Sequence, residues 1–187
     1  MLLKDYIPNL SKINRKIFFS GISFDSSKVK KNFIFFAIKG SNYDGNNFIK
    51  EAIQNGAKVI FSEEKFPKEK NDVVYLKVSN VRKLLSSVAY KIIGKKPKKL
   101  VAVTGTNGKT SVADFYYQIL TVNKKKVAAI GTIGIKFKKQ KKISHTTTLD
   151  PIELSLVLKN LKKNKIDFVI MEASSHGLKQ HRLDGLL

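Results

Sequence analysis

The stretch 104-TGTNGKT-110 joins an apolar run to a segment with helical periodicity. Its two glycines allow backbone conformations closed to other residues, so successive N–H groups can turn toward an anion. The following helix would add the positive end of its dipole, Lys109 can reach the β- and γ-phosphates, and Thr110 is placed to ligate Mg²⁺. The Walker pattern G-x-x-x-x-G-K-[ST] is met except at its first glycine, where Val103 stands. The pattern predicts a loop that binds a nucleoside triphosphate.

A second group of reactive side chains follows the apolar run 168-FVIME-172. Glu172 is expected at the carboxyl end of a buried strand, where a Mg²⁺ ligand lies in phosphate-loop enzymes. The alternative is a solvated acid, but 173-ASSHGLKQHR-182 follows with two serines, two of the three histidines, a glutamine and an arginine. The third histidine, His145, opens the hydroxyl-rich segment 145-HTTTLD-150. Such side chains around a carboxylate suit an anionic substrate beside a metal, although a lone histidine is more often a surface residue.

A parallel sheet would bring these groups together. Apolar runs predict strands at 100–104, 127–132 and 167–174, and periodicity predicts helices at 110–122 and 151–164. A lysine-rich, hairpin-like segment follows the second of these strands. Continuous apolar strands that alternate with helices are typical of a parallel sheet covered on both faces, and such sheets bind ligands at the carboxyl ends of their strands.

The first half of the chain shows a similar α/β order. Strands are predicted at 33–38 and 58–63, and helices at 48–57 and 81–93, with the turn cluster 41-SNYDGNN-47 after the first strand. The helix at 48–57 is expected to stop at Gly56. The segment 94-GKKPKK-99 combines glycine, proline and charge, as linkers do. We therefore predict two domains, residues 1–94 and 95–187.

Composition narrows the class of protein. The chain has 187 residues, 42% of them hydrophobic, and no apolar run near the roughly 20 residues that span a bilayer. It shows no secretion signal and has no cysteine, so a cytoplasmic protein without membrane insertion is expected. The net charge of +22 comes from 36 basic and 14 acidic residues. Arginine, the preferred reader of bases and phosphates, occurs only three times, so nucleic acid is an unlikely partner.

These motifs resemble the Mur ligase family of peptidoglycan synthesis, and within it the MurE branch. The loop 104–110 resembles the family's ATP loop, which also lacks the first Walker glycine. The stretch 171-MEASSHGLKQHR-182 is similar to the MurE signature almost letter for letter, and 22–63 resembles the family's UDP-binding domain. The resemblance covers the chain from about residue 20.

The resemblance implies a fold class and a reaction. The fold is α/β: a small uridine-binding domain, followed by a P-loop, Rossmann-like ATPase domain with a mainly parallel sheet that is incomplete at its C-terminus. The reaction is ATP-dependent ligation of the third amino acid to UDP-N-acetylmuramoyl-L-alanyl-D-glutamate, through an acyl phosphate, with ATP and Mg²⁺ as cofactors. The added amino acid is meso-diaminopimelate or, less commonly, L-lysine.

Roles carry over by position in this sequence. The resemblance implies ATP contacts at Gly105, Thr106, Asn107, Gly108, Lys109, Thr110 and Ser111. It implies uridine contacts at Phe24, Ser26, Ser41, Asn42 and Tyr43, and muramoyl-peptide contacts at Thr146, Thr147, Thr148, Ser174, Gln180 and Arg182. It implies catalytic roles for Lys109, Glu172 and His176, and Mg²⁺ binding by Thr110, Glu172 and His176.

Two departures affect these roles. The family's Thr-Thr-Pro reads Thr148-Leu149 in this chain, so the register of that loop is open by one residue, and its Asp-Ser-Arg reads Asp25-Ser26-Ser27. A MurE-like enzyme also continues past this length with a carbamylated lysine and a third domain.

The expectation is therefore that this chain is an N-terminal fragment, monomeric and inactive alone. Two alternatives stay open: a ligase like folylpolyglutamate synthetase, and a non-catalytic basic nucleotide-binding module.

Overall fold

The computed structural model describes residues 1–7, 16–65, 72–137, 140–142 and 146–186. The chain divides into two compact units, Met1–Val88 and Ala89–Leu187, with the division inside helix α2 (Val81–Ile93). The domain boundary between residues 94 and 95 stays a prediction. Within the described ranges, none of the helices has the length and apolar character needed to cross a membrane.

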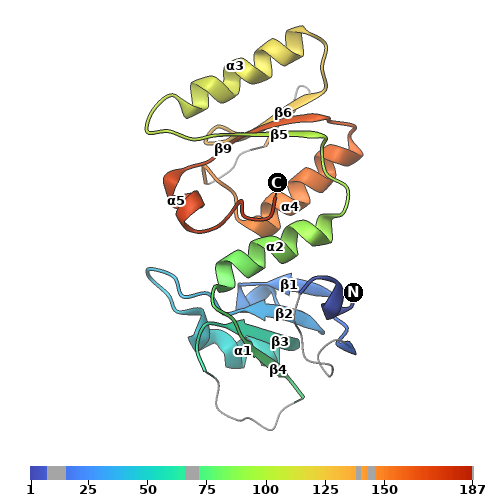
Figure 1. Ribbon diagram of the computed structural model, residues 1–187, viewed down its shortest axis with the longest axis vertical. Coiled ribbons are helices and arrows are strands. Elements are labelled where there is room, and N and C mark those ends of the chain that lie inside the picture. The colour runs from blue at the N-terminus through green and yellow to red at the C-terminus, as the bar shows by residue number, and fades with distance from the viewer. Residues whose placement is uncertain (8–15, 66–71, 138–139, 143–145, 187) are drawn as a thin grey trace. The chain divides into compact units, whose positions relative to one another are not determined.

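The first unit is built on a parallel sheet with the order β1-β2-β3-β4 (Figure 1). Its elements are η1 (Leu3–Asp5), β1 (Gly21–Ser23), η3 (Ser26–Lys28), β2 (Phe33–Phe36), η4 (Gly45–Phe48), α1 (Ile49–Gln54), β3 (Ala57–Ser62) and β4 (Val74–Lys77). Strand β2 buries Ile34 and Phe36 as well as Phe35, so both of its faces are covered, as its unbroken apolar sequence predicts.

Helix α1 ends where the sequence predicts. Gly56 has φ +104°, and a Cβ there would lie 2.8 Å from the Cα of Lys31. Only glycine meets both demands without strain, so the chain can turn directly from α1 into β3. The helix predicted at 48–57 is shorter at both ends, because Phe48 belongs to the 3₁₀ turn η4, and the chain turns after Gln54 so that Ala57 already begins β3.

The second unit is a five-stranded sheet with the order β5-β9-β6-β7-β8. Its elements are β5 (Lys99–Val103), α3 (Lys109–Val122), β6 (Val127–Gly131), β7 (Gly134–Phe137), β8 (Gln140–Lys142), α4 (Pro151–Lys163), β9 (Phe168–Glu172) and α5 (Ser175–Lys179). Strands β5, β9 and β6 are parallel, whereas β7 and β8 add antiparallel at one edge. The carboxyl ends of β5, β9 and β6 therefore lie side by side.

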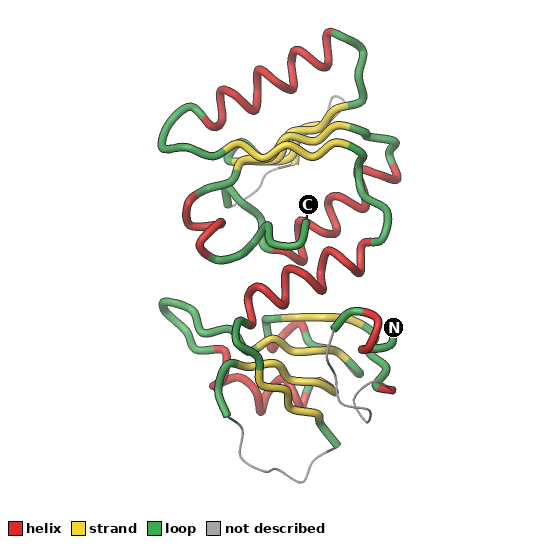
Figure 2. The backbone as a smooth tube through the Cα atoms, in the orientation of Figure 1, coloured by secondary structure: helices red, strands yellow, loops and turns green. Residues whose placement is uncertain are grey.

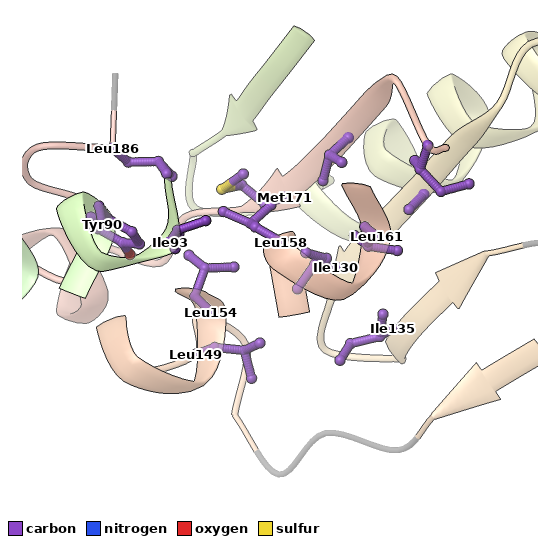
Figure 3. Close-up of a cluster of buried hydrophobic side chains, with 13 residues drawn as sticks. Tyr90, Ile93, Ile130, Ile135, Leu149, Leu154, Leu158, Leu161, Met171 and Leu186 are labelled. Atoms are coloured by element: carbon purple, nitrogen blue, oxygen red, sulfur yellow. The ribbon is translucent and has the colours of Figure 1, made fainter. Parts of the chain in front are cut away.

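Helices cover both faces of this sheet. Helix α3 lies on one face and α4 on the other (Figures 1 and 2). On the α4 side, Leu154 and Leu158 pack with Ile130 and Met171 in the larger core cluster, which also includes Tyr90 of α2 (Figure 3). On the α3 side, a smaller cluster consists of Ala113, Tyr117, Val127, Ala129 and Ile170. The two clusters hold the three parallel strands between two apolar layers.

The predicted α/β fold class is confirmed: the sheet of the first unit is parallel, and the sheet of the second unit has three parallel strands and an antiparallel edge. The strands predicted at 100–104, 127–132 and 167–174 correspond to β5, β6 and β9. The last of these predictions extends one residue before β9 and two residues beyond it, because the chain leaves the sheet after Glu172 to begin α5. Sequence reasoning missed β1, β4 and α5, which are short.

Candidate active site

The loop between β5 and α3 has the backbone of an anion-binding turn. Gly105 has φ +143° and Gly108 has φ +79°, a region that favours glycine. Gly108 is also the N-cap of α3, and no side chain caps the helix there. The first-turn N–H groups of α3 are thus left for a ligand or solvent, which is the arrangement that binds phosphate at helix N-termini.

Lys109 folds back over this loop. Its Nζ atom donates to the carbonyl oxygens of Gly105 at 2.6 Å and Thr106 at 3.1 Å. The ammonium group therefore stands beside the turn that the two glycines form. It would have to exchange these carbonyl contacts for phosphate oxygens when an anion binds.

Glu172 lies at the centre of the carboxyl edge of the sheet. Its side chain is almost fully buried, with the residue 2% exposed. One carboxylate oxygen, Oε2, accepts hydrogen bonds from the Thr110 hydroxyl at 2.9 Å and the Thr132 hydroxyl at 3.1 Å, and Oε1 accepts from the Thr132 backbone N–H at 3.1 Å. Among the residues that the structure describes, no lysine or arginine forms an ion pair with it. A buried carboxylate that is held by two hydroxyls and one backbone N–H, all of them uncharged donors, suits a site that binds a cation.

Gly131 makes room for this carboxylate. A Cβ atom at Gly131 would lie 2.1 Å from Glu172 Oε1, which is closer than non-bonded atoms can approach. The neighbouring strand end therefore needs a residue without a side chain. Strand β6 contributes this glycine and, one residue later, the two hydrogen bonds from Thr132.

Thr148 connects the 146–150 loop to the end of β9. It is 3% exposed; its hydroxyl donates to the Glu172 carbonyl at 3.0 Å and accepts from the Ser174 N–H at 2.9 Å. Leu149, which stands where the family motif has proline, is 2% exposed and belongs to the larger core cluster. Both residues anchor the loop, while Thr147 is only partly buried and Thr146 is exposed. His145 lies outside the described residues.

The segment after Glu172 forms a short capped helix, followed by an arginine that bonds to neighbouring groups. Ser174 is the N-cap of α5 and accepts from the Gly177 N–H at 3.1 Å. Arg182 donates to Gln180 Oε1 from Nε at 3.0 Å and from Nη2 at 2.8 Å, and it also donates to the Thr148 carbonyl. The guanidinium thus ties the end of this segment to the threonine loop.

The side chain of His176 lies beside Gln180. Its Nε2 atom lies 2.7 Å from Gln180 Nε2, and the residue is exposed. In the described ranges no hydrogen bond or ion pair joins it to Glu172, and no three acidic or histidine residues gather as a metal site. Of the three residues predicted to serve Mg²⁺, the structure brings Thr110 and Glu172 into contact. The role of His176 stays a prediction.

The predicted uridine contacts follow the first two strands of the other unit. Phe24 and Ser26 come after β1, and 41–43 comes after β2, so both loops leave the same edge of a parallel sheet. The side chains of Phe24 and Tyr43 are exposed at 38% and 76%. Ser41 and Asn42, in the same loop, are also exposed. By contrast, the Ser26 hydroxyl is mostly buried and donates to Glu51 Oε2 at 2.8 Å.

Asp25 caps the turn that carries Ser26. Its Oδ1 atom accepts from the Ser27 hydroxyl at 2.7 Å and from the Ser27 N–H at 3.1 Å. The hydroxyl bond from Ser27, together with Lys28 at 3.1 Å, holds the pKa of the Asp25 carboxyl below its usual value. The motif Asp25-Ser26-Ser27 therefore stabilises the turn η3, with a serine where the family has arginine.

Sequence reasoning missed Thr132. It follows β6 directly and contacts Glu172 through both its backbone N–H and its hydroxyl. The available signal was its position: a hydroxyl at the carboxyl end of a predicted parallel strand that neighbours the strand of Glu172. That neighbourhood follows from the strand order β5-β9-β6, which the chain order does not reveal.

Both halves of the chain match domains of one family. Residues 18–91 match the domain described as Mur ligase family, catalytic domain, and residues 103–187 match the Mur ligase middle domain. A curated relative from Rickettsia prowazekii, named UDP-N-acetylmuramoyl-L-alanyl-D-glutamate–2,6-diaminopimelate ligase, is 41% identical over 94% of this chain and 37% of its own length. A relative of the same name from Clostridioides difficile is 38% identical over 98% of this chain and 39% of its own length.

Solved structures agree with these matches. A structure of a UDP-N-acetylmuramoyl-L-alanyl-D-glutamate–2,6-diaminopimelate ligase superposes with a TM-score of 0.83 and 29% identity, over 99% of this chain and 38% of that one. A MurF ligase from Thermotoga maritima in complex with ADP superposes with a TM-score of 0.51 and 25% identity over 82% of this chain and 32% of that one. The chain spans well under half the length of the relatives that it matches. From these two domain matches and the relatives along the whole chain, we conclude that it belongs to the Mur ligase family.

Proposed function

We propose that this chain holds the nucleotide and muramoyl-peptide sites of an ATP-dependent ligase. The reaction joins a diamino acid, meso-diaminopimelate in preference to L-lysine, to UDP-N-acetylmuramoyl-L-alanyl-D-glutamate. The relatives that carry this name align along nearly the whole chain, which favours this reaction over that of a ligase like folylpolyglutamate synthetase. A nucleotide-activated sugar and ATP are both cytoplasmic metabolites, so we propose that the protein works in the cytoplasm.

ATP would bind at the loop 104–110. The uncapped first turn of α3 and the positive φ of Gly105 and Gly108 support a phosphate cradle. Lys109 would turn from its carbonyl acceptors to the phosphates, and Thr106, Asn107 and Ser111 would complete the contacts. Phosphoryl transfer to the substrate carboxylate depends mainly on such positioning and charge stabilisation.

The residues at the end of β9 fit Mg²⁺. Glu172 is buried without a cationic partner among the described residues, and the Thr110 hydroxyl lies 2.9 Å from its carboxylate. Hydroxyl and carboxylate oxygens are the ligands that Mg²⁺ accepts beside phosphates. When bound, the ion would neutralise the charge that develops on the transferred phosphoryl group. We infer that Thr110 and Glu172 hold it, directly or through water.

The muramoyl dipeptide would lie between the threonine loop and the α5 segment. Thr147 and Thr146 have the exposure that a substrate contact needs, whereas the Thr148 hydroxyl is committed within the protein. The Arg182 guanidinium, oriented by Gln180, would face the anionic substrate. The uridine end would bind at the exposed Phe24 and the loop 41–43 of the other unit.

One observation carries this proposal: the hydrogen bond between Thr110 and Glu172. It joins two residues 62 positions apart in the chain. Each belongs to one of the two motifs that resemble the family, and their contact combines a phosphate loop and a metal-binding carboxylate in one site. Such a pairing has no purpose in a module that only binds polyanions through lysine.

The test is nucleotide binding to the whole chain, measured by calorimetry with Mg²⁺ and ADP and, separately, with UDP. We expect Lys109→Ala to weaken ADP binding at least about tenfold, because it removes a charge-assisted contact with phosphate, and to leave UDP binding unchanged. Lys163→Ala, which removes the same charge from an exposed position at the end of α4, is the matched control. Unchanged ADP affinity in the Lys109 variant would overturn the assignment of the loop.

A further inference from the structure

Thr132 stands in a rigid turn. Strands β6 and β7 pair up to Gly131 and Gly134, so Thr132 and Ile133 are the two residues of a tight β-hairpin. Gly134, which follows these two residues, has φ +99°, whereas neither Thr132 nor Ile133 has a positive φ; a left-handed glycine directly after a turn is typical of a G1 bulge. Because both strands fix the turn, the Thr132 backbone has little freedom relative to the carboxyl edge of the sheet.

Thr132 holds both oxygens of the Glu172 carboxylate. Its N–H donates to Oε1 at 3.1 Å and its hydroxyl donates to Oε2 at 3.1 Å. Thr110 contacts only Oε2. Two contacts from one rigid residue set the plane of the carboxylate, and the missing side chain at Gly131 leaves space for it on that side.

The Thr132 hydroxyl also contacts the loop 146–150. The hydroxyl oxygens of Thr132 and Thr147 are 3.1 Å apart. The Thr132 hydroxyl is placed to donate to Thr147 Oγ1 as well as to Glu172 Oε2, so its one hydrogen is shared between these two acceptors.

We infer that Thr132 is a positioning residue that serves two ligands at once: it orients Glu172 toward a divalent cation and Thr147 toward the peptide substrate. The inference rests on the proposed function for the identity of both ligands. The three side chains form a row of contacts, Thr147–Thr132–Glu172, and the Thr132 hydroxyl in the middle contacts both of the others.

The experiment compares Thr132→Val, which keeps the shape and removes the hydroxyl, with Thr132→Ser, which restores it. The readout is the ratio of ADP affinities with and without Mg²⁺. Residues that orient metal ligands typically contribute about 10–100-fold to metal affinity, so we expect Thr132→Val to reduce this ratio at least about tenfold and Thr132→Ser to recover most of it. Thr121→Val on α3, whose hydroxyl donates to the Tyr117 carbonyl one turn earlier in the same helix, is the matched control.

Thr147→Val tests the order of the contacts. It should leave the Mg²⁺ ratio unchanged and weaken binding of UDP-N-acetylmuramoyl-L-alanyl-D-glutamate, whereas Thr132→Val should impair both. A loss of thermal stability in Thr132→Val with an unchanged Mg²⁺ ratio would show a structural role and overturn the inference. If the wild-type chain binds ADP without any effect of Mg²⁺, the proposed function fails instead, so the two failures are distinguishable.

Discussion

At the scale of single residues, the neighbouring hydroxyls of Thr147 and Thr148 have different environments. Thr148 is buried and bonds to the Glu172 carbonyl and the Ser174 N–H, whereas Thr147 is partly exposed and its hydroxyl lies, within the described part of the chain, 3.1 Å from the Thr132 hydroxyl. A family motif read from the sequence assigns both to the substrate. Burial separates them, because the Thr148 hydroxyl gives its one hydrogen to the Glu172 carbonyl, accepts from the Ser174 N–H and has Ser174 Oγ at 3.2 Å, so a ligand would have to displace contacts within the protein.

We therefore expect Thr148→Val to lower the free energy of unfolding by about 1–3 kcal/mol, since it removes a hydrogen bond to the buried Glu172 carbonyl and one from the partly buried Ser174 N–H. Thr147→Val, the adjacent control, should change it by less than about 0.5 kcal/mol. Urea unfolding of both variants measures the difference. If both variants lowered the free energy of unfolding equally, the proposed difference between the two hydroxyls would be wrong.

At the scale of elements, the P-loop helix is attached to the sheet by more than apolar contact. Asp114 of α3 lies 2.6 Å from the Lys136 ammonium on β7, and that ammonium also lies 5.1 Å from the centre of the Tyr117 ring. The hydrogen bond from Lys136 is the main cause that holds the pKa of Asp114 below its usual value. This pair joins the helix of the nucleotide loop to the hairpin that carries Thr132.

The lowered pKa predicts a pH dependence. A carboxyl with a lower pKa in the folded state contributes stability above its unfolded pKa and loses it as the pH falls through the folded pKa. The wild type should thus exceed Asp114→Asn in stability by less than about 1 kcal/mol at pH 7, because the pair is partly exposed. That excess should shrink below about pH 4. Chemical unfolding between pH 7 and pH 3 tests this, and a constant difference would contradict it.

At the scale of the whole molecule, charge is strongly unbalanced. The sequence has 36 basic and 14 acidic residues. The ion pairs of the described residues are few and partly exposed, and each belongs to a single unit. Repulsion between lysines therefore outweighs the attraction that those pairs provide.

Salt that screens the repulsion between lysines should then stabilise the protein. Raising NaCl from about 20 mM to 200 mM shortens the Debye length from roughly 20 Å to below 10 Å, so we expect the Tm to rise by a few degrees. The buffer must contain no phosphate, which could bind at the loop 104–110. Sucrose at equal osmolality is the control for non-ionic effects. A Tm that falls with NaCl would mean that ion pairs dominate over repulsion.

The sequence by itself determined the elements and the motifs that they carry. Apolar runs and periodicity located β5, β6, β9, α3 and α4 to within a few residues, because unbroken apolar strands and amphipathic helices are local patterns. The loop 104–110 and Glu172 could also be recognised locally, from their residue types and from their positions directly after apolar runs. The short elements β1, β4 and α5 were not, since few residues carry too little periodicity to detect.

Only the tertiary structure decided which of these residues meet. Strand β9 comes last in the chain yet inserts between β5 and β6, and this order puts Glu172 against Thr110 on one side and Thr132 on the other. It also buries Thr148 beside a freer Thr147 and separates His176 from the hydrogen bonds of Glu172. Strand order, burial and hydrogen-bond direction arise from contacts between distant segments, and no local pattern of residues contains them.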